Sequence, residues 1–416
     1  MSMNVGSRRA WWLLPVLLVL AGCTARSATL PTLTTSGAAA IDRMFQNAVD
    51  SKEIPGVVAA VVNRDRVLYL KAFGKQDVGR GIPMSTDTVF RIASMTKPVT
   101  STGIMMLYEQ GKLGLDDPVG NYLPAYKGRE VIATFNEHEA TYTTRPAKSE
   151  ITIRHLLTQT AGFGYDFTSP TVAALLTKTG KEPQDLPLLF DPGTKWTYSA
   201  ATRVLGNVIE KLSGQSIETW DQAKIFGPLG MKDTTYSPGP EAVKRLATIH
   251  QRDATGLTEI PNPEQFTPTV RGDGGLVSTA ADYAAFVQLF LNEGRWHGQQ
   301  LLKPDTVRQM TTNQIGAVVV ETMPAVLPRR SATFPFGAGV DKFGLGFQIT
   351  MTDGASTHER GVGSYTWAGI DNTQFWVDPR NGIGVVILTQ VLPFYNDVSM
   401  AVLKRFERLI YEDLSS

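Results

Sequence analysis

The sequence predicts an α+β architecture in which one antiparallel sheet is assembled from strands near both ends of the chain. Two apolar, β-branched runs lie within residues 56–73, and two more lie within residues 374–389. Between these ends, over roughly residues 110–330, apolar residues recur mainly at helical spacing. We therefore expect helices to flank the sheet and a mainly helical region to be inserted between its two halves.

The N-terminal part of the predicted domain begins with a helix and a hairpin. Apolar residues recur at helical spacing before Pro55-Gly56, which ends the segment: Ile41, Met44, Phe45, Ala48 and Val49. The runs Gly56–Asn63 and Val67–Phe73 follow and are joined at Arg64-Asp65. This pattern predicts a β-hairpin.

The middle of the chain contains four segments with helical periodicity: Met95–Tyr108, Ile151–Thr158, Thr202–Leu212 and Ala280–Leu291. The last of them follows a glycine-rich stretch, Gly272-Asp273-Gly274-Gly275. Residues 313–340 show no clear period, and we expect a long loop there, near the mouth of a pocket.

The C-terminal part returns to strands. Gln374–Val377 and Ile383–Thr389 are separated by the turn-forming residues 378–382, which predicts a second pair of strands. A helix closes the chain, and its apolar face is formed by Val398, Val402, Phe406 and Leu409.

Residues 1–22 have the pattern of a signal peptide. Arg8 and Arg9 precede an apolar run, Trp11–Leu20, that is too short to span a bilayer as a mature helix. The run ends in Leu20-Ala21-Gly22-Cys23, which resembles the lipobox of bacterial lipoproteins, and Cys23 is the only cysteine of the chain. An ordinary signal peptide beside an unrelated cysteine is the alternative, and export by the Sec or the Tat route stays open.

The lipobox resemblance implies cleavage before Cys23 and lipidation of its thiol. Acyl chains there would anchor the exported protein to a membrane without a transmembrane segment. Thr24, rather than Asp, follows the cysteine, which implies sorting to the outer membrane and a periplasm-facing protein. Residues 23–36, rich in Thr, Ser, Ala and Pro, predict a flexible tether, and residues 37–416 predict the folded domain.

The overall charge argues against a nucleic-acid partner. The formal net charge is +1 over 416 residues, and no long basic run interrupts an ordinary globular composition. The sequence leaves the oligomeric state open.

The residues that carry chemistry centre on Ser94 and Lys97, the only S-x-x-K pair of the chain. The nucleophile elbow G-x-S-x-G is absent, and none of the five histidines lies in a recognisable triad context. If Ser94 opens the helix predicted after it, Lys97 lies on the same face, above the serine hydroxyl. The alternative is a serine that caps the helix and a lysine that is solvated.

Four segments in order resemble class C β-lactamases and the related family VIII carboxylesterases. They are residues 90–98 (FRIASMTKP), 151–163 (ITIRHLLTQTAGF), 190–199 (FDPGTKWTYS) and 274–282 (GGLVSTAAD), and the likeness extends over roughly residues 40–412. The resemblance implies a β-lactamase/DD-peptidase-like fold and a serine hydrolase that requires no cofactor or metal.

The resemblance also implies the roles of individual residues. Ser94 would be the nucleophile, and Lys97 and Tyr198 would exchange its proton. The family's K-T-G strand corresponds to Trp367-Ala368-Gly369, where family VIII esterases carry W-G-G. The backbone N–H groups of Ser94 and Ile370 would then form the oxyanion hole.

Two departures from the β-lactamase pattern favour an ester substrate. Trp367 replaces the lysine that would meet a β-lactam carboxylate, and Ala200 replaces an asparagine that would bind an amide. We therefore expect a substrate pocket at Trp367, Ala368, Gly369 and Ala200 that accepts short-chain or aromatic esters. The alternatives are a β-lactamase, a D-alanyl-D-alanine carboxypeptidase-type enzyme and an inactive envelope binding protein.

Overall fold

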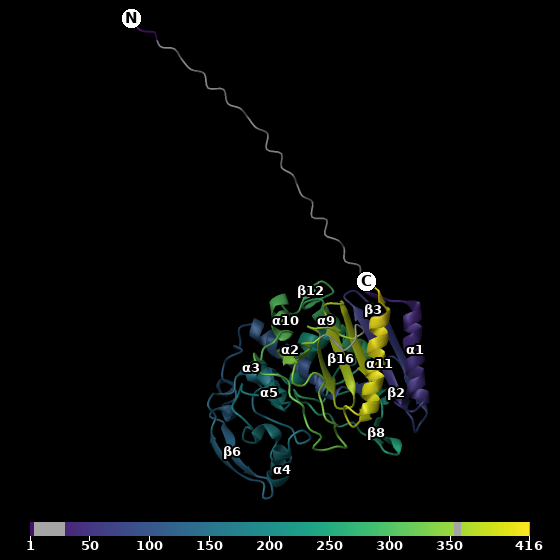
Figure 1. The fold of residues 1–416 in the computed structure, drawn as a ribbon, viewed down its shortest axis with the longest axis horizontal. Coiled ribbons are helices and arrows are strands. Elements are labelled where there is room, and N and C mark those ends of the chain that lie inside the picture. The colour runs from purple at the N-terminus through teal and green to yellow at the C-terminus, as the bar shows by residue number, and fades with distance from the viewer. Residues whose placement is uncertain (4–29, 353–358, 416) are drawn as a thin grey trace.

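The computed structural model describes residues 1–3, 30–352 and 359–415 (Figure 1). Cys23 and nearly all of the predicted signal peptide, residues 1–22, lie outside the described residues. In the part of the chain that is described, no helix combines the length and the hydropathy needed to cross a bilayer.

An eight-stranded antiparallel sheet forms the centre of the domain, as the sequence predicted. The strand order is β13-β14-β15-β16-β17-β2-β3-β4. The bounds are β13 (Lys342–Phe343), β14 (Gln348–Ile349), β15 (Tyr365–Gly369), β16 (Thr373–Asp378), β17 (Ile383–Leu388), β2 (Gly56–Asn63), β3 (Val67–Asp77) and β4 (Ile82–Pro83). β17 pairs with β2 over six residues, so the two ends of the chain meet in the middle of the sheet.

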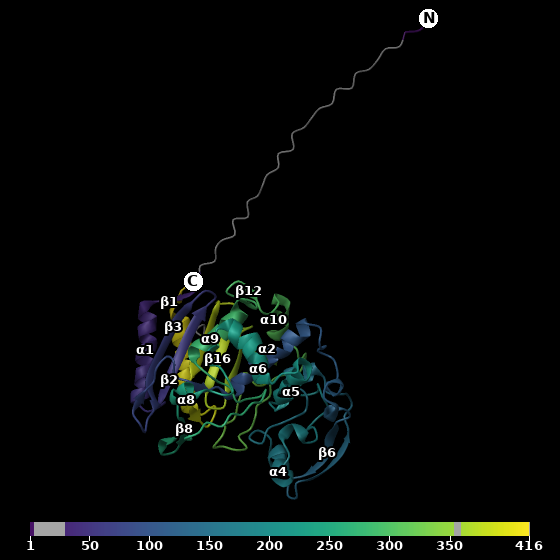
Figure 2. The same cartoon turned by 180° about the vertical axis from the view of Figure 1, so that it is seen from behind.

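Both faces of the sheet are covered, which explains the unbroken apolar run of β2. Val57, Ala59 and Val61 face α1 (Thr35–Asp50) and α11 (Asp397–Asp413), where Phe45 and Phe406 complete one core. Val58, Ala60 and Val62 face the opposite core, which contains α9 (Ala280–Leu291) and α2 (Thr96–Glu109). Figures 1 and 2 show α1 and α11 at the end of the domain remote from α4 and β6.

The predicted tether gives way to regular structure earlier than expected. β1 (Thr32–Leu33) pairs with β19 (Leu414–Ser415), and α1 begins at Thr35 rather than after residue 36. The Thr34 side chain caps α1 by accepting the Gly37 N–H, and the Thr34 N–H donates to Asp413. These bonds tie residues 32–36 to the C-terminal helix, so this part of the tether prediction is corrected.

The inserted region contains more strand than its sequence pattern indicated. Its α-helices are α3 (Ile153–Leu157), α4 (Pro170–Thr179), α5 (Ala201–Ser213), α6 (Ile217–Asp221), α7 (Gly227–Leu229), α8 (Pro240–Lys244), α9 and α10 (Pro304–Met310). Three hairpins accompany them: β6 (Glu130–Asn136) with β7 (Thr141–Pro146), β8 (Ile249–Asp253) with β9 (Gly256–Ile260), and the short pair β11 (Arg295–Trp296) with β12 (Gln299–Gln300). The first hairpin is largely solvent-exposed and rich in threonine, so it lacks an apolar period.

Ser94 is held where the central sheet meets the inserted region. It lies in a short 3₁₀ turn, η1 (Ala93–Met95), and Ala93 before it has a left-handed φ of 44°. Gly369 ends β15 directly against the Ile92 carbonyl, and a Cβ at this glycine would overlap that oxygen and the Thr373 hydroxyl. The lack of a side chain at position 369 therefore sets how closely β15 approaches the turn that carries Ser94.

We predict that Gly369→Ala lowers the free energy of unfolding by about 1–3 kcal/mol, because backbone must move to admit the methyl group. The same shift displaces η1 from β15, so fluorophosphonate labelling of Ser94 slows as well. Urea unfolding and labelling rates measure the two effects. Gly239→Ala is the control, since a Cβ there meets nothing within 4 Å. Wild-type stability and labelling in Gly369→Ala would contradict the role given to this contact.

Candidate active site

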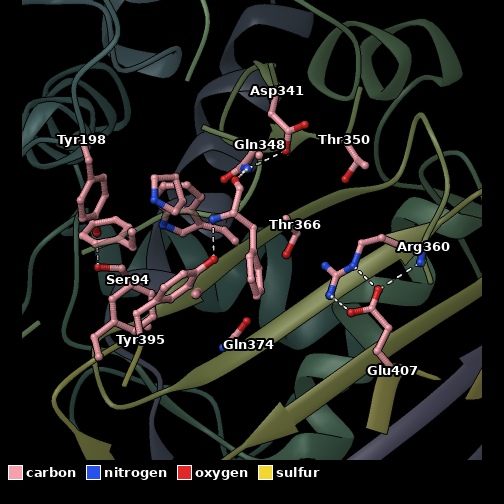
Figure 3. Close-up of a pocket in the computed structure, with 18 of the residues that line it drawn as sticks. Ser94, Tyr198, Asp341, Gln348, Thr350, Arg360, Thr366, Gln374, Tyr395 and Glu407 are labelled. Atoms are coloured by element: carbon pink, nitrogen blue, oxygen red, sulfur yellow. Dashed lines mark hydrogen bonds and ion pairs between the residues drawn. The ribbon is translucent and has the colours of Figure 1, made fainter. Parts of the chain in front are cut away.

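The structure brings Ser94, Lys97 and Tyr198 into mutual contact. Lys97 Nζ lies 3.1 Å from Ser94 Oγ and 2.9 Å from the Tyr198 hydroxyl. The Tyr198 hydroxyl lies 2.5 Å from Ser94 Oγ (Figure 3). η1, the first turn of α2 and the residues just before α5 supply these three side chains.

Ser94 does not act as a helix cap, and Lys97 is not a solvated cation. Met95 occupies the N-cap position of α2, without a side-chain capping bond, and the Ser94 hydroxyl turns toward Lys97 and Tyr198 instead. The Lys97 residue is only 3% exposed. The alternative in which Ser94 caps the helix and Lys97 is solvated is therefore wrong.

A third oxygen completes the surroundings of the Lys97 amine. The Asp273 carbonyl accepts a hydrogen bond from Lys97 Nζ at 2.8 Å. Thr100 on α2 donates to the neighbouring Gly272 carbonyl at 2.8 Å, and a Cβ at Gly272 would collide with the Thr202 carbonyl on α5. The glycine-rich stretch thus fits between α2 and α5 and presents a carbonyl to the lysine. Sequence reasoning recorded this stretch but gave it no role.

The Asp273 carboxylate has its own buried partners. The Tyr165 hydroxyl donates to it at 2.6 Å, and Arg203 Nε and Nη2 each donate to it at 3.2 Å. Burial would raise the pKa of Asp273, but the positive charges of Lys97 and Arg203 and these hydrogen bonds outweigh it, so the pKa lies below its usual value. The sequence analysis did not predict this role. The one available signal was an acidic residue within a glycine-rich run, residues 272–275.

Burial shifts the pKa values of Lys97 and Tyr198 in opposite directions. Burial lowers the pKa of Lys97 to about 7, although the Asp273 carboxylate acts in the opposite direction. Burial raises the pKa of Tyr198 well above its usual value, against the lowering effect of its bond to Ser94. At neutral pH the phenol therefore keeps its proton, whereas a large share of Lys97 is neutral.

Ser94 opens into a cavity of about 370 Å³ that is aromatic at this end. The aromatic lining residues are Phe167, Tyr198, Phe334, Phe336, Trp367, Phe394 and Tyr395. Figure 3 shows Ser94 and Tyr198 at one end and the Arg360–Glu407 ion pair, with a 2.7 Å contact, at the other. Phe334 and Phe336 come from the predicted loop 313–340, which indeed lies at the pocket, but sequence reasoning did not single them out.

Three of the four residues predicted for the substrate pocket line this cavity: Trp367, Ala368 and Gly369. The Trp367 ring lies 5.0 Å from the Tyr198 ring, between centroids. Ala200 is a correction, because it is fully buried at the start of α5, within the apolar core, and does not line the cavity. Packing of the first turn of α5 into that core removes it from the pocket.

Ile370 follows β15 and lines the same cavity as Ser94. The close approach of Gly369 to Ile92 holds the end of β15 next to η1. The assignment of an oxyanion hole to the N–H groups of Ser94 and Ile370 stays a prediction.

His155 has a structural environment. Its Nδ1 accepts the Thr152 N–H at 3.2 Å, and its own N–H donates to the Thr152 hydroxyl, which together form a capping box at α3. Within the described residues, no three His, Cys, Asp or Glu side chains gather as a metal site would require.

Comparison with known proteins places this architecture in a family. The Beta-lactamase family model matches residues 41–407. Protein Rv1367c of Mycobacterium tuberculosis is 32% identical over 362 residues, covering 83% of this chain and 88% of that protein. Esterase EstB of Burkholderia gladioli is 28% identical over 391 residues, covering 85% and 90%. A mutant of simvastatin synthase from Aspergillus terreus superposes with a TM-score of 0.80 at 26% identity, covering 91% and 95%. The chain therefore belongs to the β-lactamase family, as an enzyme with esterase and acyltransferase relatives.

Proposed function

We propose that this protein is a carboxylesterase that hydrolyses short-chain or aromatic esters through an acyl-enzyme on Ser94. The observation that carries the proposal is the contact of the Ser94 hydroxyl with buried Lys97 and with Tyr198, at the wall of an aromatic cavity. A nucleophile within hydrogen-bond reach of a base is the arrangement that acyl transfer needs.

Lys97 is the base in this proposal. A neutral amine donates two hydrogen bonds and accepts one, and the three oxygens around Nζ fit that pattern. The amine donates to the Asp273 carbonyl and the Tyr198 hydroxyl and accepts the proton of Ser94. Tyr198 donates to Ser94 Oγ and closes the ring of hydrogen bonds.

The reaction then follows in two halves. Ser94 Oγ attacks the ester carbonyl and passes its proton to Lys97, while the N–H groups of Ser94 and Ile370 bind the oxyanion. The proton moves through Tyr198 to the leaving alcohol, the C–O bond of the ester breaks, and an acyl-Ser94 remains. A water molecule then gives a proton to the same pair and attacks the acyl group. The bond between Ser94 Oγ and the acyl carbon breaks, the proton returns to Ser94 Oγ, and the acid leaves.

The cavity supports an uncharged ester rather than a β-lactam. Trp367 occupies the place of the family's lysine and contacts the Tyr198 ring, so the wall beside the nucleophile is apolar. The name of the relative EstB agrees with this choice. A β-lactamase or D-alanyl-D-alanine carboxypeptidase-type activity and an inactive envelope binding protein are the alternatives that the first experiment tests.

Acyl transfer to an alcohol is a second candidate for the same acyl-enzyme. Aromatic walls around Ser94 bind an apolar alcohol better than they bind water. The esterase assay repeated with added butanol measures the ester product of this transfer.

We predict that Ser94→Ala lowers kcat for p-nitrophenyl butyrate by about 10³-fold or more, because the nucleophile is lost. Intact-protein mass spectrometry of the wild type after brief exposure to this ester should reveal a butyryl adduct on Ser94. Exposure to a cephalosporin should give at most a slow adduct. A fast-turning cephalosporin adduct without ester turnover would reassign the protein to the β-lactam side. Failure of Ser94 to react with a phosphonate or any ester would favour the binding protein.

We predict that kcat/KM rises with pH and reaches half its plateau near pH 7, the pKa to which burial lowers Lys97. Below that pH the ammonium form cannot accept the Ser94 proton, so activity falls. Rates between about pH 5 and about pH 9 test the profile. Tyr198→Phe should lower kcat by about 10²–10⁴-fold and keep the rise with pH. A flat wild-type profile would exclude Lys97 as the base.

We propose further that Cys23 carries the lipid that attaches the exported enzyme to the outer membrane. The support is the lipobox-like end of the signal peptide and the absence of any other cysteine. Cys23→Ser should move the protein from the membrane fraction to the soluble periplasmic fraction and abolish labelling by a radioactive fatty acid. Membrane attachment that persists in Cys23→Ser would refute the anchor.

A further inference from the structure

We propose that Asp273 and Arg203 form a buried charge pair that sets the protonation state of Lys97, which makes both of them positioning residues of the Ser94 site. The inference rests on the proposed function in one respect, the assignment of Lys97 as the base. It concerns residues that touch neither the reacting bond nor the cavity lining.

Asp273 contacts Lys97 through its backbone and Arg203 through its side chain. Its backbone carbonyl accepts the Lys97 ammonium or amine hydrogen at 2.8 Å, and its carboxylate binds Arg203 and Tyr165. The bonds from Arg203 and Tyr165 therefore hold the side chain of the same residue whose carbonyl orients the lysine. The Gly272 contact with α5 holds the same loop from the other side.

The pair is buried, which makes its charges effective. The Asp273 side chain is 3% exposed and the Arg203 side chain 12%. Arg203 lies in the first turn of α5, and its Nη1 binds Glu182 at 2.5 Å and Gln184 at 3.2 Å. With little water between them, these charges act on Lys97 more strongly than surface charges would.

Three segments around Lys97 carry charged groups. α2 carries Lys97 itself, α5 carries Arg203, and the glycine-rich loop carries Asp273 and Arg271, whose Nε lies 3.7 Å from the Asp273 carboxylate. The remaining neighbours are two neutral phenols. Tyr198 contacts the amine, and the Tyr165 ring centroid lies 5.2 Å from Nζ.

The signs of these charges are opposed. The Asp273 carboxylate alone favours the ammonium form of Lys97, whereas Arg203 and Arg271 favour the neutral amine. Arg203 also neutralises the carboxylate by binding it through two nitrogens. A buried lysine beside an unpaired carboxylate would stay protonated and could not accept the Ser94 proton. Arg203 therefore keeps the base available at neutral pH.

The experiment compares the pH midpoint of kcat/KM for p-nitrophenyl butyrate in variants with opposite charge changes. Asp273→Asn removes the negative charge and should lower the midpoint by about one pH unit. Arg203→Met removes the positive charge and should raise it by about one pH unit. The double variant should fall between the single variants, and Arg203→Lys, which keeps the charge, should stay near the wild type. A purely structural role would lower rates at every pH and leave the midpoints unmoved.

A second readout separates this inference from the proposed function. In a Ser94→Ala background, the protein labelled with [ε-¹³C]lysine gives an NMR titration of Lys97, which Lys97→Arg identifies. The same opposite shifts are expected even if the wild type turns over no ester. Where Asp273→Asn or Arg203→Met fails to fold, Asp273→Ser or Arg203→Gln carries the same charge change and replaces it. Unmoved midpoints, or midpoints that move in the same direction in both folded variants, would overturn the proposal.

Discussion

The burial of one lysine amine between Ser94, Tyr198 and the Asp273 carbonyl is the constraint on which the rest of the site depends. A buried cation is costly unless oxygen atoms surround it, so three separate segments must converge on Nζ. Their convergence requires the glycine-rich loop to fit between α2 and α5, where position 272 tolerates no side chain. Burial also lowers the pKa of this amine to about 7, so a large share of it is neutral at neutral pH.

The central sheet also contacts the site, through the end of β15 and the residue before η1. β2 and β17 join the two ends of the chain, and β15 extends that sheet until Gly369 lies against the Ile92 carbonyl. The position of Ser94 therefore depends on contacts between segments far apart in the chain. One example is the hydrogen bond from the Thr373 hydroxyl to the Ile92 carbonyl at 3.4 Å, which joins residues 281 positions apart. A change that destabilises this part of the sheet is therefore expected to displace Ser94 as well.

Much of the fold was predictable because its signals are local and periodic. The β2–β3 hairpin, α9 and the C-terminal strands were predicted close to their observed bounds, since buried strands and helices must repeat their apolar residues. The hairpin β6–β7 was not predicted, because it is largely exposed and threonine-rich.

At the site, Ser94, Lys97 and Tyr198 were predicted from the resemblance of short segments. Asp273, Arg203 and Tyr165 could not be derived that way, because their importance arises only when three distant segments meet. Ala200 was misplaced for the converse reason, since sequence alignment with a family position does not reveal that a helix start turns into the core.

The aromatic ring cluster beside Ser94 connects the electrostatics to substrate choice. Tyr198 contacts the rings of Tyr165, Phe167, Phe334 and Trp367, so the phenol that hydrogen-bonds to the nucleophile is itself held in an apolar wall. Burial in that wall raises the pKa of the phenol, and the same wall gives the cavity an apolar surface beside Ser94. A lysine in the place of Trp367 would add a cation to Lys97, Arg203 and Arg271 and would favour the neutral amine further. Replacing it with an indole leaves the charge balance around Lys97 to Asp273 and the two arginines. The residue at position 367 therefore affects both the polarity of the cavity wall and the charge around Lys97.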